Sequence, residues 1–138
     1  MALRTFKILV FSLPLFAYKL AIADELSVDS CYENSGSYQV IECINQRIET
    51  AKINLNNQRK LFVNKNQDIL HDDKRFDKKE ASINKKWLLF ANDDCKMRSF
   101  HSGDEDSIMY QTVFGECMFN MYLERTNSLK NSLKLIEG

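Results

Sequence analysis

The sequence is poor in the residues that break helices. Its 138 residues include only one proline and four glycines, whereas a loop-rich all-β domain needs many turn residues. The content of 44% hydrophobic and 11% aromatic residues is too high for a disordered chain. A chain of this length forms one domain with a modest core. We therefore expect a single, mainly helical domain.

No apolar run is long enough to anchor the chain in a bilayer. The run at residues 8–18 has 11 residues, whereas a membrane-spanning helix needs about 20. Arg4 and Lys7 precede this run, and Ala21-Ile22-Ala23 follows it with the small-x-small pattern of a cleavage site. This layout predicts a secretory signal peptide at 1–23, cleaved after Ala23. Residues 24–138 would then form one domain, soluble in the periplasm or outside the cell and without a membrane anchor.

The remaining 115 residues also lack an excess of positive charge. They hold 16 Lys and Arg against 19 Asp and Glu, a formal charge of −3. A protein that binds nucleic acid usually presents a basic face to the phosphate backbone. We therefore expect no nucleic-acid partner.

Motifs for catalysis and for metal binding are missing as well. His71 and His101 are the only histidines, and neither belongs to an HxxxH, HExxH or Ser/His/Asp motif. The acidic run from Asp104 lacks the glycine that a calcium loop needs at its sixth position, which is Met109 here. We expect no enzyme, no cofactor and no metal, and we interpret both histidines as solvated loop residues.

The four cysteines form an even set after the predicted cleavage site. Such a set predicts two disulfides in an oxidising compartment. Three pairings can form, and we favour Cys31–Cys43 with Cys95–Cys117 because the members of each pair are near in sequence. The gaps of 12, 52 and 22 residues do not match the usual spacing of zinc ligands. Each closure is expected to add about 3 kcal/mol of stability.

Three stretches carry apolar residues at the spacing of amphipathic helices. The first is expected to begin at Ser37 as its N-cap and to weaken after about Phe62. The second is expected to begin at Asp77, in a capping box with Glu80, and to end near residues 95–97. The third runs to about residue 136, with an N-cap expected in the acidic run at 104–106. A capping box at residues 30–33 predicts a short turn before the first helix.

Apolar stripes on three helices must face one another to be buried. This predicts an all-α fold, a small antiparallel bundle of three main helices to which a short fourth could be added. Ile83, Trp87 and Phe90 form the expected stripe of the second helix, which places the aromatic pair in the core rather than on a binding platform. The other expected stripes are Ile41, Ile44, Ile48, Ala51, Leu55, Gln58 and Phe62, and then Phe114, Cys117, Met121, Arg125, Leu129, Leu133 and Ile136.

Arg125 is the one charged residue in these stripes. A guanidinium group in that position must reach water or a carboxylate. Asp93 or Asp94 is the expected partner, and the pair would be structural.

Residues 99–107 have the composition of a loop and are the best candidate for contact with a partner. They lie between Cys95 and Cys117, and a disulfide at the base of the loop would reduce the entropy lost on binding. The alternative is an ordinary connecting loop. The candidate contact residues are Ser99, His101, Ser102, Asp104, Glu105 and Asp106.

Several of these residues together form a recognisable pattern. The C-terminal half reads Trp87-x-x-Phe90-x4-Cys95, followed by Cys117-x7-Arg125-x3-Leu129. With Cys31, Cys43 and the Leu55-Asn56 pair in the N-terminal half, the pattern resembles the LprI-like lysozyme-inhibitor family over about residues 31–133. The chain departs from the family at Asn84, where Gln is usual, at Ala91, where Arg is common, and in a loop that is often richer in glycine.

The resemblance implies a small disulfide-linked envelope protein that inhibits lysozyme-type muramidases by occluding their substrate cleft. A net negative charge would speed its encounter with basic animal lysozymes. Ser102 or His101 would then hydrogen-bond the catalytic carboxylates of the enzyme. The alternative is an envelope interaction module of another specificity, such as an immunity protein against a delivered toxin. The sequence leaves the oligomeric state open.

Overall fold

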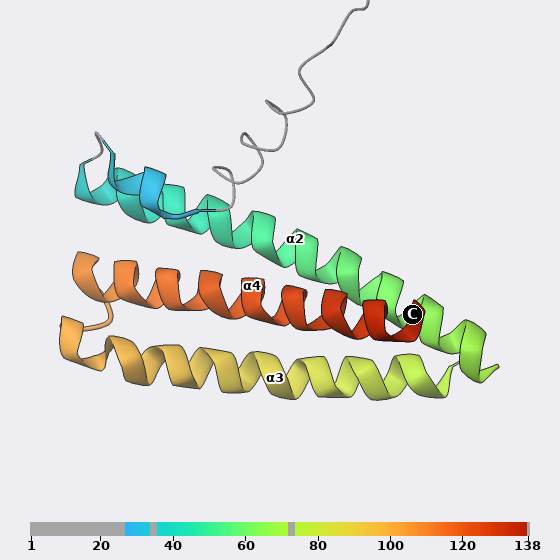
Figure 1. Ribbon diagram of the computed structural model, residues 1–138. Helices are drawn as coiled ribbons and strands as arrows, with labels where there is room; N and C mark the ends of the chain where they lie inside the picture. Colours follow the sequence, from blue (N-terminus) through green and yellow to red (C-terminus); the bar gives the residue numbers. More distant parts are fainter. Residues whose placement is uncertain (1–26, 34–35, 72–73, 138) are drawn as a thin grey trace, which may run out of the picture.

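The protein is a bundle of three long helices. The computed structural model describes residues 27–33, 36–71 and 74–137, and the predicted signal peptide lies outside them. Within these ranges the chain forms helices and no strand (Figure 1). The elements are η1 (Asp29–Tyr32), α2 (Ser37–Leu70), α3 (Arg75–Ser99), η2 (Phe100–Ser102) and α4 (Ile108–Glu137). The prediction of an all-α bundle is confirmed.

Helix α4 lies between the other two long helices. It runs in the same direction as α2 and opposite to α3 (Figure 1). Contacts of α2 with α3 are fewer than those of either helix with α4, and they include the Phe62–Phe76 ring contact near the connection between α2 and α3. Because α4 packs on two neighbours, it buries residues beyond the single predicted stripe. Its buried residues are Tyr110, Gly115, Met118, Phe119, Tyr122, Thr126 and Leu129.

Helix α2 buries the central part of its predicted stripe, from Ile44 to Leu55. The helix begins and ends differently from the prediction. Ser37 is its first residue rather than its N-cap, and the backbone N–H of Gly36 donates to the Gln39 side chain at 2.6 Å. The helix also continues to Leu70, about two turns beyond Phe62, and Val63 in this extension is buried.

Helix α3 turns a different face to the core from the one predicted. Trp87 is half-buried and meets Tyr122 edge to ring, with 5.6 Å between the centroids. Ile83 and Phe90 are exposed, so their predicted place in the core is wrong. The small Ala91 lets α3 approach α4 closely, and the Cys95 disulfide fixes the same face inward. The apolar spacing alone could not show that small residues form the contact.

Both predicted disulfides are present. Cys31–Cys43 joins η1 to α2 with 5.6 Å between the Cα atoms. Cys95–Cys117 joins the end of α3 to α4 with 5.5 Å between the Cα atoms. The predicted short turn at residues 30–33 is η1, but it has no side-chain cap. The first disulfide therefore holds the N-terminal turn on the bundle, and the second holds two of the long helices together.

Arg125 has a different neighbour from the predicted carboxylate. Its guanidinium carbon lies 6.0 Å from the centre of the Trp87 ring, which is cation–π geometry. Asp94 pairs instead with Arg98, one turn along its own helix, at 2.8 Å. Asp93 is exposed. The predicted Arg125–Asp pair is therefore wrong, because the tryptophan face takes the place of the carboxylate.

Candidate partner-binding site

The predicted contact loop is partly helical. Ser99 is the last residue of α3, and residues 100–102 form η2. Ser99 is completely buried, and its hydroxyl donates to the Cys95 carbonyl at 2.8 Å. Ser99 therefore cannot contact a partner, and that part of the prediction is wrong. Its position one turn after Cys95 keeps it against the disulfide-linked helix.

Hydrogen bonds from Ser107 hold the turn between η2 and α4. Its backbone N–H donates to the Asp104 carbonyl at 2.8 Å, and its hydroxyl accepts from the Tyr110 N–H at 3.1 Å. Ser107 thus caps α4, and the predicted Asp cap is wrong. Gly103 has a φ of 118°, a backbone conformation that favours glycine. The turn is therefore fixed between the Cys95–Cys117 disulfide and the first turn of α4.

The acidic side chains of this turn face solvent. Asp104, Glu105 and Asp106 are all exposed, and no ion pair involves them within the described residues. His101 is exposed beside them, with its ring 5.8 Å from that of Phe100, and Ser102 is half-buried. The structure therefore brings five of the six predicted contact residues together.

Apolar side chains that the sequence analysis missed border this acidic turn. Met97 and Phe100 are each about three-quarters exposed, and Met109 is about two-thirds exposed. A surface hollow lies between the apolar and acidic groups, with the buried Tyr110 at its base. The sequence signal for these side chains was an apolar pair three residues apart, Met97 and Phe100, shortly before the acidic run at 104–106. The hollow is lined by Lys96, Met97, Phe100, His101, Gly103, Asp104, Glu105 and Tyr110.

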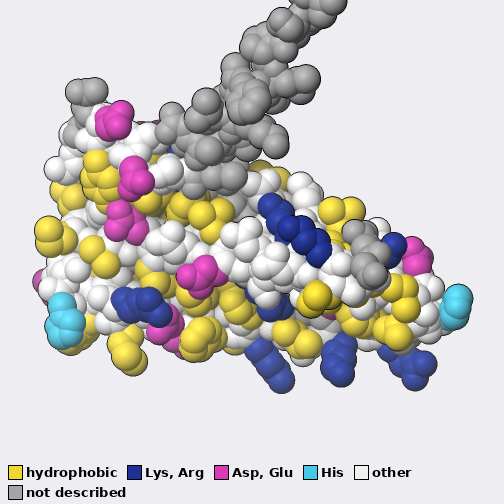
Figure 2. Space-filling view, viewed as in Figure 1, with side chains coloured by type: hydrophobic (Ala, Val, Ile, Leu, Met, Phe, Trp, Pro, Cys, Tyr) yellow, Lys and Arg dark blue, Asp and Glu magenta, His cyan; other side chains and the backbone are white. Residues whose placement is uncertain are grey.

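Charge is unevenly distributed along the bundle. Acidic side chains predominate at the end that holds the two disulfides, and Lys and Arg predominate over the opposite half (Figure 2). The acidic residues of the disulfide end are Asp29, Glu33, Glu42, Glu49, Asp93, Asp94, Asp104, Glu105, Asp106, Glu116 and Glu124. The basic residues of the opposite half are Arg59, Lys60, Lys65, Lys74, Arg75, Lys78, Lys79, Lys85, Lys86, Lys130 and Lys134. A modest net charge therefore conceals a strong charge asymmetry.

A hydrogen bond between η1 and α4 also lies at the acidic end. The Tyr32 hydroxyl of η1 donates to the Glu116 carboxylate of α4. Burial, and then the hydrogen bond and the negative charge of Glu116, raise the pKa of Tyr32 well above its usual range. The phenol therefore stays protonated and keeps its donor role. The residues lie 84 positions apart, which is why their contact escaped the sequence analysis.

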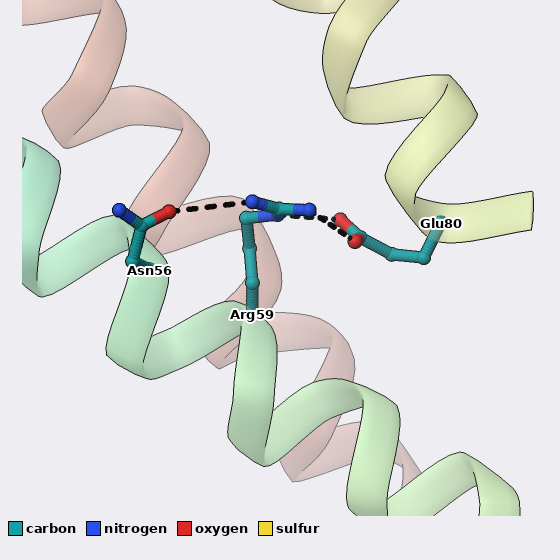
Figure 3. Close-up of polar contacts among 3 residues, drawn as sticks. All are labelled: Asn56, Arg59 and Glu80. Carbon is teal, nitrogen blue, oxygen red and sulfur yellow. Dashed lines mark hydrogen bonds and ion pairs between the residues drawn. The ribbon is translucent and has the colours of Figure 1, made fainter. Parts of the chain in front are cut away.

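A second hollow lies between α2 and α3, in the basic half, and a buried ion pair forms part of its wall. Arg59 donates to both carboxylate oxygens of Glu80, at 2.9 and 2.6 Å, and to Asn56 at 3.3 Å (Figure 3). The predicted capping role of Glu80 is therefore wrong, because α3 already begins at Arg75. Glu80 lies two helical turns before Trp87, on the same buried face of α3. This spacing was the sequence signal that could have identified Glu80 as a buried residue. The pair joins two helices and is structural.

Metal ligands, membrane-spanning helices and relatives among known proteins also bear on the kind of site. Within the described ranges, no group of His, Cys, Asp and Glu could hold a metal ion, and no helix is long and apolar enough to cross a membrane. Compared with protein-family models, curated proteins and solved structures, the chain has no significant match.

Proposed function

We propose that the protein is an LprI-like envelope protein that inhibits lysozyme-type muramidases by placing its acidic end over their substrate cleft. One observation carries the proposal. Exposed carboxylates at residues 104–106 lie beside exposed Met97 and Phe100, on a turn fixed by a disulfide. The family resemblance of the Trp, Cys, Arg and Leu spacing supports the same function. Two disulfides are typical of an oxidising compartment such as the periplasm.

The proposed mechanism combines attraction with a rigid contact. The carboxylates attract a basic enzyme over long distances and orient the acidic end toward it. Met97, Phe100 and Met109 then bury apolar surface, which is the usual source of short-range affinity. The disulfide and the Ser107 hydrogen bonds keep the turn in one conformation, so little entropy is lost on binding.

Hydrogen bonding within the cleft is the third part of the proposal. His101 is exposed and can reach a catalytic carboxylate of the enzyme, whereas the half-buried Ser102 is a weaker candidate. In this mechanism the protein blocks substrate by occupancy. It is not an enzyme and uses no cofactor or metal.

A lysis assay tests the proposal directly. Oxidised residues 24–138 are titrated against chicken-type and bacterial muramidases on cell-wall substrate, and we expect stoichiometric inhibition of at least one enzyme. The variant Asp104→Asn/Glu105→Gln/Asp106→Asn should inhibit at least tenfold more weakly, and its inhibition should depend less on salt. Asp104→Asn/Glu105→Gln and Asp68→Asn/Asp77→Asn form a matched pair, because each removes two negative charges and Asp68 and Asp77 are exposed outside the acidic end.

The outcomes separate the acidic turn from net charge. Equal loss of inhibition in the two matched variants would mean that only the overall charge matters, and an unchanged 104–106 variant would disprove the turn as the contact. If no muramidase is inhibited at micromolar excess, the proposal is wrong. A pull-down from envelope extract would then look for another partner, such as a delivered toxin.

A further inference from the structure

Helix α3 carries a stripe of exposed apolar side chains on its outer side. Ile83, Phe90 and Met97 are 46%, 61% and 76% exposed. They are seven residues apart, so about two helical turns separate each from the next and all three lie on one face. In Figure 2 hydrophobic side chains follow the lower edge of the molecule, where α3 lies, between lysine and arginine side chains.

Among the described residues, the bundle leaves this stripe without a partner. The face of α3 that packs on α4 carries Trp87, Ala91 and Cys95. The stripe lies on a different side of the helix, although apolar residues at heptad spacing are typical of a helix that packs against another helix. A contact outside the described chain would bury it.

The charges beside the stripe change sign at Phe90. Lys79 and Lys86 are exposed on the N-terminal side of Phe90, and Asp93 is exposed on the C-terminal side. Lys86 and Asp93 have no ion-pair partner among the described residues. Lys96 and Arg98 do not reverse the pattern, because Lys96 points about a third of a turn away from Phe90 and Arg98 pairs with Asp94.

We propose that this face of α3 binds a second copy of the chain in an antiparallel dimer, with the two-fold axis at Phe90. Ile83 and Met97 are equidistant from Phe90, about 10 Å along the helix on either side, so each meets the other across the interface. Lys86 lies about 6 Å before the axis and Asp93 about 4.5 Å after it, so each lysine comes level with an aspartate of the partner. Parallel helices would instead place like charges together.

This arrangement is self-complementary, as a two-fold interface must be. It brings apolar residues to the centre and opposite charges together along one flank of the interface, and both partners contribute the same residues. Met97 also belongs to the proposed muramidase contact, so the two contacts compete for this side chain. The dimer itself does not depend on muramidase inhibition, because it is argued from the stripe and the charges beside it.

Sedimentation velocity of oxidised residues 24–138 at micromolar to millimolar concentration tests the dimer. We expect a monomer–dimer equilibrium, and Phe90→Glu should abolish it. Ile53→Glu on α2 is the matched control, because Ile53 and Phe90 have the same exposed fraction, 61%. Circular dichroism checks that both variants remain helical. A wild-type chain that stays monomeric at every concentration, or dimers that survive Phe90→Glu, would overturn the proposal.

Charge reversal tests the antiparallel register without altering the apolar stripe. Lys86→Glu and Asp93→Lys each place two like-charge contacts in the symmetric dimer, so each should raise the dissociation constant about tenfold. The double variant Lys86→Glu/Asp93→Lys restores opposite charges and should return it to near the wild-type value. A double variant as weak as the singles would contradict the antiparallel register.

Discussion

Two ion pairs of equal length in this protein differ in burial, which decides their effect on stability. Lys52–Glu49 and Arg59–Glu80 both have an N–O distance of 2.6 Å. The Lys52 and Glu49 side chains are 40% and 67% exposed, whereas those of Arg59 and Glu80 are 20% and 6% exposed. Water screens the first pair and solvates either partner alone. If one partner of the second pair is removed, a charge remains in a poorly solvated place.

Glu80→Ala should therefore destabilise the protein by about 3 kcal/mol, because it leaves Arg59 uncompensated between α2 and α3. Glu49→Ala, the control, should cost less than about 1 kcal/mol. The double variant Arg59→Met/Glu80→Leu should be more stable than Glu80→Ala, since apolar side chains can replace a buried pair. The free energy of unfolding in urea measures all three. Equal effects of Glu80→Ala and Glu49→Ala would show that burial does not matter here.

The long helices themselves could be predicted from the sequence, but their contact faces could be predicted only in part. The stripe of α2 from Ile44 to Leu55 was correct because the large residues Ile44, Ile48 and Leu55 mark its face around Ala51. The contact face of α3 was missed because Ala91, Cys95 and Ser99 form its most buried part. Small residues permit close helix packing, yet they add little to an apolar pattern. Large residues such as Phe90 then dominate the pattern while they lie outside.

A close approach of α2 and α4 depends on another small residue, Gly115. A Cβ atom at this position would lie 2.7 Å from Cγ2 of Ile44, well inside van der Waals contact. Alanine is favoured over glycine within a helix by about 1 kcal/mol, but an overpacked core costs about 1–3 kcal/mol. The steric term should therefore exceed the helical preference.

Gly115→Ala is expected to destabilise the protein by about 1 kcal/mol, since overpacking outweighs the propensity gain. In an Ile44→Ala background the steric conflict is absent, and the same substitution should stabilise by up to about 1 kcal/mol. A double-mutant cycle of urea unfolding measures both steps. If Gly115→Ala has the same sign in both backgrounds, the contact with Ile44 is not what limits the residue at this position.

At the scale of the whole molecule, the acidic composition of the loop pointed to the candidate site. The sequence did not reveal which side chains surround that loop in space. The acidic run was visible as charge, and its exposure at residues 104–106 follows from that charge. The apolar border at Met97 and Phe100, and the opposite charge of the other end, depend on how the helices are arranged in space. Contacts between distant residues, such as Tyr32 with Glu116, leave no local pattern either.

That distant contact predicts how the stability of the molecule depends on pH. The pKa of Tyr32 is raised in the folded protein, so the folded state favours the protonated phenol. Its contribution is complete below the pKa of an unfolded tyrosine, about 10, and is lost as the pH rises further. Burial also raises the pKa of Tyr122, which adds to the same alkaline loss. Alkaline loss of stability should therefore come from both tyrosines.

Two substitutions distinguish the contributions of Tyr32 and Tyr122 to this alkaline loss. Tyr32→Phe removes the hydrogen bond to Glu116, so it should lower the free energy of unfolding by about 1 kcal/mol at neutral pH and reduce the further loss above pH about 10. Tyr122→Phe should also reduce the alkaline loss, but with little change at neutral pH, because no hydrogen bond of its hydroxyl is seen within the described chain. Urea unfolding at neutral pH and above pH about 10 measures both. A Tyr32→Phe variant that matches the wild type at both pH values would show that the tether between η1 and α4 does not contribute to folding.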